Sequence, residues 1–88
     1  MEFRWIDWNI DKVHSHGVEP EEAEEAVGNA RPPYPRKDLD GRWLVQAQSD
    51  GGRFLQVVYL VDPEGTLFII HSRPLTEREK KKLRRRRS

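Results

Sequence analysis

Arginine and histidine recur near the predicted strand ends of this 88-residue chain, and both residue types can act on a phosphate ester. Arg73 and His71 are two residues apart in the segment TLFIIHSR, so they share one face of an extended strand. Arg53 opens the preceding apolar segment, RFLQVVYLV, and we predict that the three side chains gather on the sheet face away from the helices. An arginine fork can bind two phosphate oxygens, and histidine transfers protons near neutral pH.

The histidines His14 and His16 lie at the end of the first predicted helix but do not form a metal site. Two histidines two residues apart lie on different faces of a helix, and the chain has no cysteine to complete a tetrahedron. We therefore predict no metal and no other cofactor. His14 suits a helix end, where a cation meets the negative pole, whereas His16 can either end the helix or reach a phosphate. Lys12 is either solvated or part of a basic rim.

The charge of the chain is divided between its two halves. Residues 1–41 hold five Lys/Arg and ten Asp/Glu, a net charge of −5. Residues 42–88 hold eleven and five, a net charge of +6, and the two halves sum to the overall +1. The basic half favours a polyanionic partner, although a solvated basic helix end would carry the same charges.

Composition restricts the class of protein further. No apolar run approaches the ~20 residues that a membrane helix needs, and the first residues lack the basic and apolar regions of a signal peptide. The absence of cysteine excludes disulfides and zinc–thiolate sites, and it fits a reducing compartment. We therefore expect a cytoplasmic protein with no membrane association.

The first part of the chain predicts one short strand followed by two helices. The segment EFRWI alternates as a strand does, and Asp7 is placed to cap a helix that Gly17 ends. Pro20 suits the first position of a second helix, which has a narrow apolar stripe and is closed by Gly28 and Asn29.

The second part predicts three strands and one helix. Segments 42–48, 53–61 and 66–73 alternate with period two and are joined by the turn sequences SDGG and DPEG, which predicts an antiparallel meander centred on the second segment. Thr76 and Glu79 form a capping box that opens the last helix. The predicted fold class is α+β, in the order β-α-α-β-β-β-α, with an antiparallel sheet, the first strand at its edge and both early helices on one face.

The last helix has few apolar residues to hold it. Leu75 and Leu83 are its only apolar anchors, so we expect fraying after Leu83. We therefore predict a single domain over residues 1–83 and a basic, disordered tail over residues 84–88.

Aromatic residues are predicted to divide between core and surface. Trp5, Trp8 and Trp43 are expected in the core or at its edge, because the chain has little other apolar material. Tyr34 lies in the proline-rich segment 31–41, for which we predict no regular structure. We expect Tyr34 to be exposed for stacking or for contact with a partner.

Several segments together match the pattern of a known family. FRWIDWNIDKV, HGV and EPEEAEEAV are followed by DGRW, DGGRFLQVV and IIHSRPLTERE in that order. Over roughly residues 3–83 this pattern resembles the BrnT-type toxins. The resemblance implies a RelE-like fold and a metal-independent endoribonuclease that cleaves mRNA, the toxin of a type II toxin–antitoxin pair. It also implies a cognate antitoxin with a ribbon-helix-helix domain, through which the complex would contact operator DNA.

The resemblance also implies which residues act. Carried over position by position, it assigns basic and acid–base roles to His16, Arg53, Arg73 and Glu79. His71 stands where the family has a small hydroxyl residue, and it joins this catalytic set only through its place beside Arg73. The alternatives are a salt bridge to an acidic loop residue for Arg73 and an edge-strand surface position for His71. Such cleavage must deprotonate the 2′-OH, stabilise a dianionic phosphorane and protonate the leaving 5′-oxygen. The side chains predicted to bind RNA are Lys12, Lys80, Lys81, Lys82 and Arg84.

Departures from the family pattern support a second interpretation. Ser15 stands where the family often has a basic residue, Leu83 near the place of a common tyrosine, and Gln46–Gln48 in a segment that is often Gly-Arg-Thr-like. These residues favour a catalytically weakened nucleic-acid-binding or regulatory module with the same fold. A third interpretation is a structural partner protein whose basic tail binds an acidic antitoxin.

Overall fold

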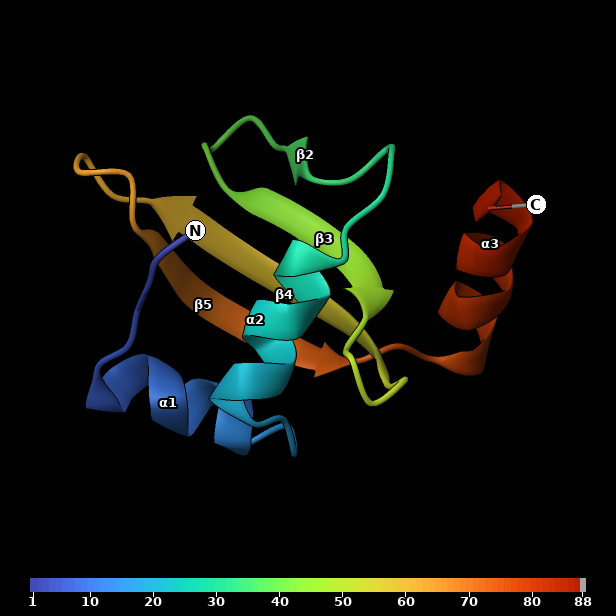
Figure 1. Ribbon diagram of the computed structural model, residues 1–88, viewed down its shortest axis with the longest axis horizontal. Helices are drawn as coiled ribbons and strands as arrows, with labels where there is room; N and C mark the ends of the chain where they lie inside the picture. Colours follow the sequence, from blue (N-terminus) through green and yellow to red (C-terminus); the bar gives the residue numbers. More distant parts are fainter. Residues whose placement is uncertain (88) are drawn as a thin grey trace.

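Five strands form one mixed sheet in the computed structural model, which describes residues 1–87. The strands are β1 (Phe3–Arg4), β2 (Arg36–Lys37), β3 (Trp43–Gln48), β4 (Phe54–Val61) and β5 (Leu67–Pro74). Their order across the sheet is β1-β5-β4-β3-β2, with β1 parallel to β5 and the other neighbours antiparallel (Figure 1). The predicted α+β class, the meander of β3, β4 and β5 and the edge position of β1 are confirmed.

The structure corrects the predicted sheet in two respects. Segment 31–41 contains the short strand β2, in which Arg36 pairs with Leu44 and Lys37 with Trp43. These two residues follow the last proline of the segment and keep their N–H groups, so they can extend the edge of β3. The sheet is also mixed rather than antiparallel, because β1 pairs in parallel with β5.

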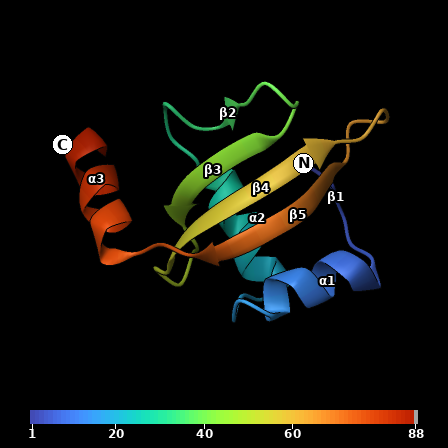
Figure 2. The same cartoon turned by 180° about the vertical axis from the view of Figure 1, so that it is seen from behind.

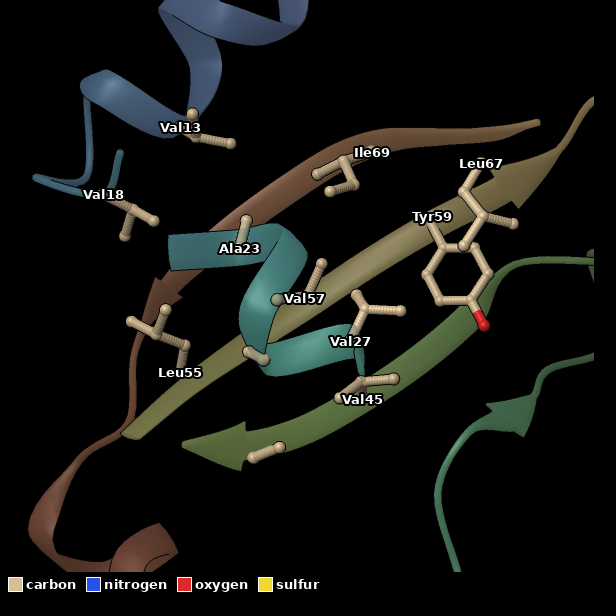
Figure 3. Close-up of a cluster of buried hydrophobic side chains, with 12 residues drawn as sticks. Val13, Val18, Ala23, Val27, Val45, Leu55, Val57, Tyr59, Leu67 and Ile69 are labelled. Atoms are coloured by element: carbon tan, nitrogen blue, oxygen red, sulfur yellow. The ribbon is translucent and has the colours of Figure 1, made fainter. Parts of the chain in front are cut away.

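Three helices complete the domain: α1 (Asp7–His14), α2 (Pro20–Gly28) and α3 (Glu77–Arg87). As predicted, α1 and α2 cover the same side of the sheet, here called the helical face, with α1 along β5 and α2 across β3 and β4 (Figure 1). The apolar core lies between them (Figure 3). Its fully buried side chains from the sheet are Val45, Ala47, Leu55, Val57 and Ile69. Each large aliphatic side chain buried there contributes roughly 1.5–3 kcal/mol.

The other side of the sheet, here called the open face, is covered by a helix only at one end (Figure 2). At that end α3 buries Leu75 and Leu83 together with Tyr34, against Leu44 and Phe54 of the sheet. The acidic helix α2 and the basic helix α3 therefore lie on opposite faces. The remainder of the open face is left accessible beside the basic helix.

The basic helix is longer than expected. Helix α3 continues through Arg87, so fraying after Leu83 and disorder of residues 84–87 were wrong predictions, while Ser88 lies outside the described residues. Leu83 is buried, and Arg86 donates from Nη1 to the hydroxyl of Tyr34 at 3.0 Å. This contact ties the last turns of α3 to the loop before β2.

Tyr34 is buried rather than exposed, contrary to the prediction. Only 7% of it is accessible, and its hydroxyl donates to Oε1 of Gln46 at 3.1 Å. The aromatic ring supplies apolar surface against which Leu75 and Leu83 pack. This burial determines the position of Tyr34 although the loop around it is polar. Trp5 and Trp43 pack at the edge of the core as predicted.

Helix α1 is capped by Asn9 and not by Asp7. Asn9 is fully buried, its Oδ1 accepts the backbone N–H of Ile6 at 2.7 Å, and its Nδ2 donates to carbonyls of β1 and β5. Asn9 and Val13, four residues apart, form the buried stripe of the helix. Trp8 falls beside that stripe and is 49% exposed, so its predicted place in the core was wrong.

Candidate functional site

A β-bulge in β5 determines which of its side chains reach the open face. The pairing with β4 passes from Ile69 directly to His71, so Ile70 is an extra residue. Strict alternation from the buried Ile69 would turn His71 and Arg73 toward the helices, but the extra residue reverses the alternation. Ser72 takes the buried position, and its hydroxyl donates to a carbonyl of β4 at 3.0 Å.

His16 and His71 form an imidazole pair at the free edge of β5. Their ring centroids are 5.2 Å apart and their planes meet at 69°, an edge-to-face contact. Within residues 1–87, β1 pairs only with Leu67 and Phe68, so the rest of this edge has no strand partner. The end of α1 lies beside the edge there, which allows His16 to reach His71.

The position of His16 is fixed by the way α1 ends. Gly17 adopts a φ of 73°, its N–H donates to the carbonyl of His14 at 2.9 Å, and the N–H of Val18 donates to the carbonyl of Val13 at 3.0 Å. These two bonds form a Schellman cap, in which the two valines also meet in the core. A side chain at residue 17 would strain the left-handed turn, so glycine is needed next to His16.

The surroundings of His71 favour its neutral form. Burial lowers the pKa of His71 below its usual value of about 6.5, and the nearby charges of His16, Arg73 and Lys12 lower it further. A neutral imidazole can accept a proton, and a cluster with surplus positive charge attracts an anion. Four predicted site residues are therefore brought together here.

Arg73 is held by Glu79 through two parallel hydrogen bonds. Nη1 and Nη2 each donate to one carboxylate oxygen at 2.8 Å, and the two side chains are 29% and 26% exposed. The guanidinium, helped by the backbone N–H of Thr76, lowers the pKa of Glu79 to about 2. A carboxylate with so low a pKa is a poor proton acceptor and no donor at neutral pH, so this geometry favours a role for Glu79 in positioning Arg73 over the predicted acid–base role.

Arg53 does not join this cluster. Its Nη1 donates to the carbonyl of Gly17 at 3.0 Å and to the carboxylate of Glu22 at 2.8 Å, so it links the ends of α1 and α2 on the helical face. The predicted gathering of the three side chains on the open face was therefore wrong for Arg53. The reason is alternation: Arg53 is two residues before Leu55, which points into the core.

The predicted RNA-binding residues of α3 lie in different surroundings. The Lys80 ammonium is 6.0 Å and the Arg84 guanidinium 5.1 Å from the centroid of the Phe54 ring, where both cover the end of the open face. Lys81 is exposed. Lys82 lines a hollow between α3 and the sheet. On α1, the Lys12 ammonium lies 5.4 Å from the ring centroid of the exposed Trp8.

Two glutamines that connect the site were not predicted. Oε1 of Gln56 accepts Nε2 of Gln46 at 3.1 Å and, more weakly, Nη2 of Arg73 at 3.4 Å. Both are polar residues within otherwise apolar strands, and this pattern is the sequence signal that could have identified them as part of the site. Gln46 also binds Tyr34, so the amides join Arg73 to the buried tyrosine.

Comparison with known proteins identifies no relative: the chain matches no protein-family model, no curated protein and no solved structure. Within residues 1–87, no group of three or more His, Cys, Asp or Glu residues is arranged to hold a metal ion. Across the same residues, no helix has both the length and the apolar character required to cross a membrane. The site is therefore interpreted from its own geometry, beside the motif resemblance described above.

Proposed function

We propose that this protein is a metal-independent endoribonuclease, the toxin of a type II toxin–antitoxin pair. The observation that carries the proposal is the imidazole pair of His16 and His71, 5.2 Å apart and next to Arg73 on an accessible strand edge. Two imidazoles can transfer two protons in one reaction, and a guanidinium can stabilise the charge that develops between those transfers.

Each of the three side chains has one role in the proposed reaction. His71, whose pKa is lowered, accepts the proton of the 2′-OH as that oxygen attacks the phosphorus. Arg73 stabilises the dianionic phosphorane. His16 donates a proton to the leaving 5′-oxygen. The products are a 2′,3′-cyclic phosphate and a 5′-OH, and no water is consumed in this first step.

The biological setting of the proposal follows from the motif resemblance. The ordered segments HGV, EPEEAEEAV and SRPLTERE support a BrnT-type toxin with a RelE-like arrangement of the α+β domain. The RNA would be cytoplasmic mRNA. A ribbon-helix-helix antitoxin would neutralise the toxin and carry the complex to its operator DNA. The accessible open face beside α3 is the surface on which we expect that antitoxin to lie.

One set of contacts favours the alternative of a weakened binding module. Arg73 donates to Glu79 twice, to the carbonyl of Pro74 at 3.1 Å and to Gln56 at 3.4 Å. A phosphate must therefore use Nε of Arg73 or displace the long bond to Gln56. If the phosphate does neither, the basic surface would bind RNA without cutting it.

The test is cleavage of an end-labelled single-stranded RNA by purified protein in the presence of a chelator. We expect cutting with 2′,3′-cyclic phosphate ends, no cutting of a 2′-O-methyl copy of the same sequence, and growth arrest on expression without an antitoxin. The double variant H16A/H71A, purified identically, excludes a contaminating nuclease. Loss of activity with the chelator would overturn the metal-free reaction. Absence of both cleavage and toxicity in the wild type would favour the binding module.

A further inference from the structure

A hollow of about 220 Å³ lies between α3 and the open face, beyond the Arg73–Glu79 pair. Its lining comes from three parts of the chain: Tyr34, Arg36, Leu44, Gln46, Glu79, Lys82 and Arg86. One water occupies about 30 Å³ of liquid volume, so the hollow has room for a phosphate group and part of its sugar.

The hollow carries positive charge that the described residues leave unbalanced. Within residues 1–87, neither Arg36 nor Lys82 takes part in an ion pair, and the polar contact of Arg86 is with the hydroxyl of Tyr34. The one carboxylate in the lining belongs to Glu79, which is already bound to Arg73. Three cations around one small space repel one another, and an anion between them would relieve that repulsion.

The floor of the hollow is a chain of hydrogen bonds that leads to the proposed active site. Arg86 donates to the hydroxyl of Tyr34, and that hydroxyl donates to Gln46. Gln46 donates to Gln56, which accepts from Arg73. The hollow and the histidine pair thus lie on either side of Arg73, and the chain of hydrogen bonds leads from the hollow to Arg73.

We propose that this hollow binds a backbone phosphate of the RNA strand, further along that strand from the scissile phosphate. The inference rests on the proposed function for the identity of its ligand. Arginine and lysine both bind phosphate, and two guanidinium groups from different elements, Arg36 on β2 and Arg86 on α3, can hold its oxygens from two sides. The RNA would then cross Arg73 as it passes from the histidine pair to α3.

The test measures binding separately from cleavage. A fluorescent 2′-O-methyl oligoribonucleotide, which lacks the attacking hydroxyl, is titrated with the full chain over a series of salt concentrations. The variant is R36A/K82A, which removes two lining charges that take part in no ion pair within residues 1–87. The matched control is R31A/R78A, which removes two exposed charges outside the hollow. Thermal unfolding of both variants verifies that they fold.

We expect R36A/K82A to reduce the slope of log affinity against log salt by about 0.7 for each phosphate that the hollow no longer binds, and the control to change it less. Equal changes in the two variants would overturn the inference, because the charges would then act only as a diffuse field. If a nucleoside monophosphate binds the hollow as tightly as the oligonucleotide does, the phosphate in the hollow need not belong to an RNA strand, and the inference is overturned. If R36A/K82A weakens the binding of polyglutamate but leaves the salt slope for RNA unchanged, the inference is overturned and the ligand is an acidic protein segment.

The outcomes for the two proposals are distinguishable. If the wild type cleaves RNA but R36A/K82A keeps the wild-type salt slope, the inference about the hollow fails and the proposed function stands. If the wild type binds the oligonucleotide through the hollow but does not cleave RNA, the inference about the hollow is supported and the proposed endoribonuclease activity is contradicted.

Discussion

Two arginine–glutamate pairs, one on each face of the sheet, join a strand end to the start of a helix. Arg53 binds Glu22 and Arg73 binds Glu79, each with a shortest bond of 2.8 Å. Each glutamate is the third residue of its helix and also accepts the backbone N–H of the residue that caps it. The two pairs differ in their donors, because Arg73 uses both Nη atoms, one for each carboxylate oxygen, whereas Arg53 uses Nη1 alone for both oxygens.

The neighbouring residues distinguish the two arginine–glutamate pairs further. Arg53 also donates to the carbonyl of Gly17 and so closes the junction of α1 with α2. Arg73 lies on the open face, next to His71 and in contact with Gln56. The difference comes from alternation in β4 and from the bulge in β5. Under the proposed function, an arginine at a strand end is thus structural or chemical according to the face on which it lies.

The largest effect that separates the two pairs is on catalysis. Arg73→Ala is expected to slow RNA cleavage by about 10²–10³-fold, because it removes the donor to the developing charge. Arg53→Ala should keep most of the rate. Both variants leave a glutamate without its partner, so both should lose roughly 0.5–1.5 kcal/mol in the free energy of unfolding. Cleavage rates and denaturant unfolding measure the two quantities, and equal losses of rate would remove the distinction between the faces.

The second prediction concerns the pH dependence on the open face. His71 must be neutral to accept a proton, so kcat/KM should fall as the pH drops through the lowered pKa of His71, below the usual value of about 6.5. Lys12→Ala removes one of the charges that lower this pKa, so it should move the acid limb to higher pH. His71→Gln should cost about 10²-fold in rate.

The control for this prediction is the exposed His14, which pairs with Glu19 away from the site. His14→Gln should leave both the rate and the acid limb unchanged. NMR titration of the histidine ring protons identifies which imidazole moves in Lys12→Ala. An acid limb that stays in place in Lys12→Ala would contradict the electrostatic explanation of the site.

Much of the fold was readable because its signals are local. Period-two segments, the turn glycines and the T-x-x-E box each depend on a few adjacent residues, and they predicted the meander and the start of α3. The burial of Asn9 was not readable, since its Nδ2 donates to a carbonyl of β5 that only folding brings close. The likeness to RelE proteins remains a proposal.

The candidate site was predictable only in part, because its key feature has no local signature. Ile70 looks like any other apolar strand residue, yet as the bulged residue it turns His71 and Arg73 to the open face. The contact between His16 and His71 joins segments 55 residues apart, and sequence reasoning assigned each a place but not their pairing. Tyr34 was predicted to be exposed because the residues around it are polar. That local pattern gives no sign of the tertiary contact with α3 that buries the ring.

The smallest predicted effect compares the two glutamates directly. Glu79→Gln keeps an oxygen for the N–H of Thr76 but no longer neutralises Arg73, whose charge becomes available to RNA. The affinity for a 2′-O-methyl oligonucleotide should rise several-fold, with a salt slope steeper by about 0.7. Glu22→Gln makes the same chemical change on the helical face and should leave RNA binding unaltered. Equal gains from both variants would contradict the assignment of RNA to the open face.

The same variant also tests the ion pair through its pH dependence. The pKa of Glu79 is about 2 in the folded protein, against about 4.5 for an ordinary glutamate, so the unfolded chain binds the extra proton between these values. The stability that this carboxylate contributes is therefore complete above about pH 4.5 and is lost as the pH falls toward 2. The free energy of unfolding of the wild type should exceed that of Glu79→Gln by roughly 1–2 kcal/mol at neutral pH, and the two values should converge near pH 2. Urea unfolding at a series of pH values measures the difference, and a gap that stays constant down to pH 2 would mean that Arg73 does not hold Glu79 as an ion pair.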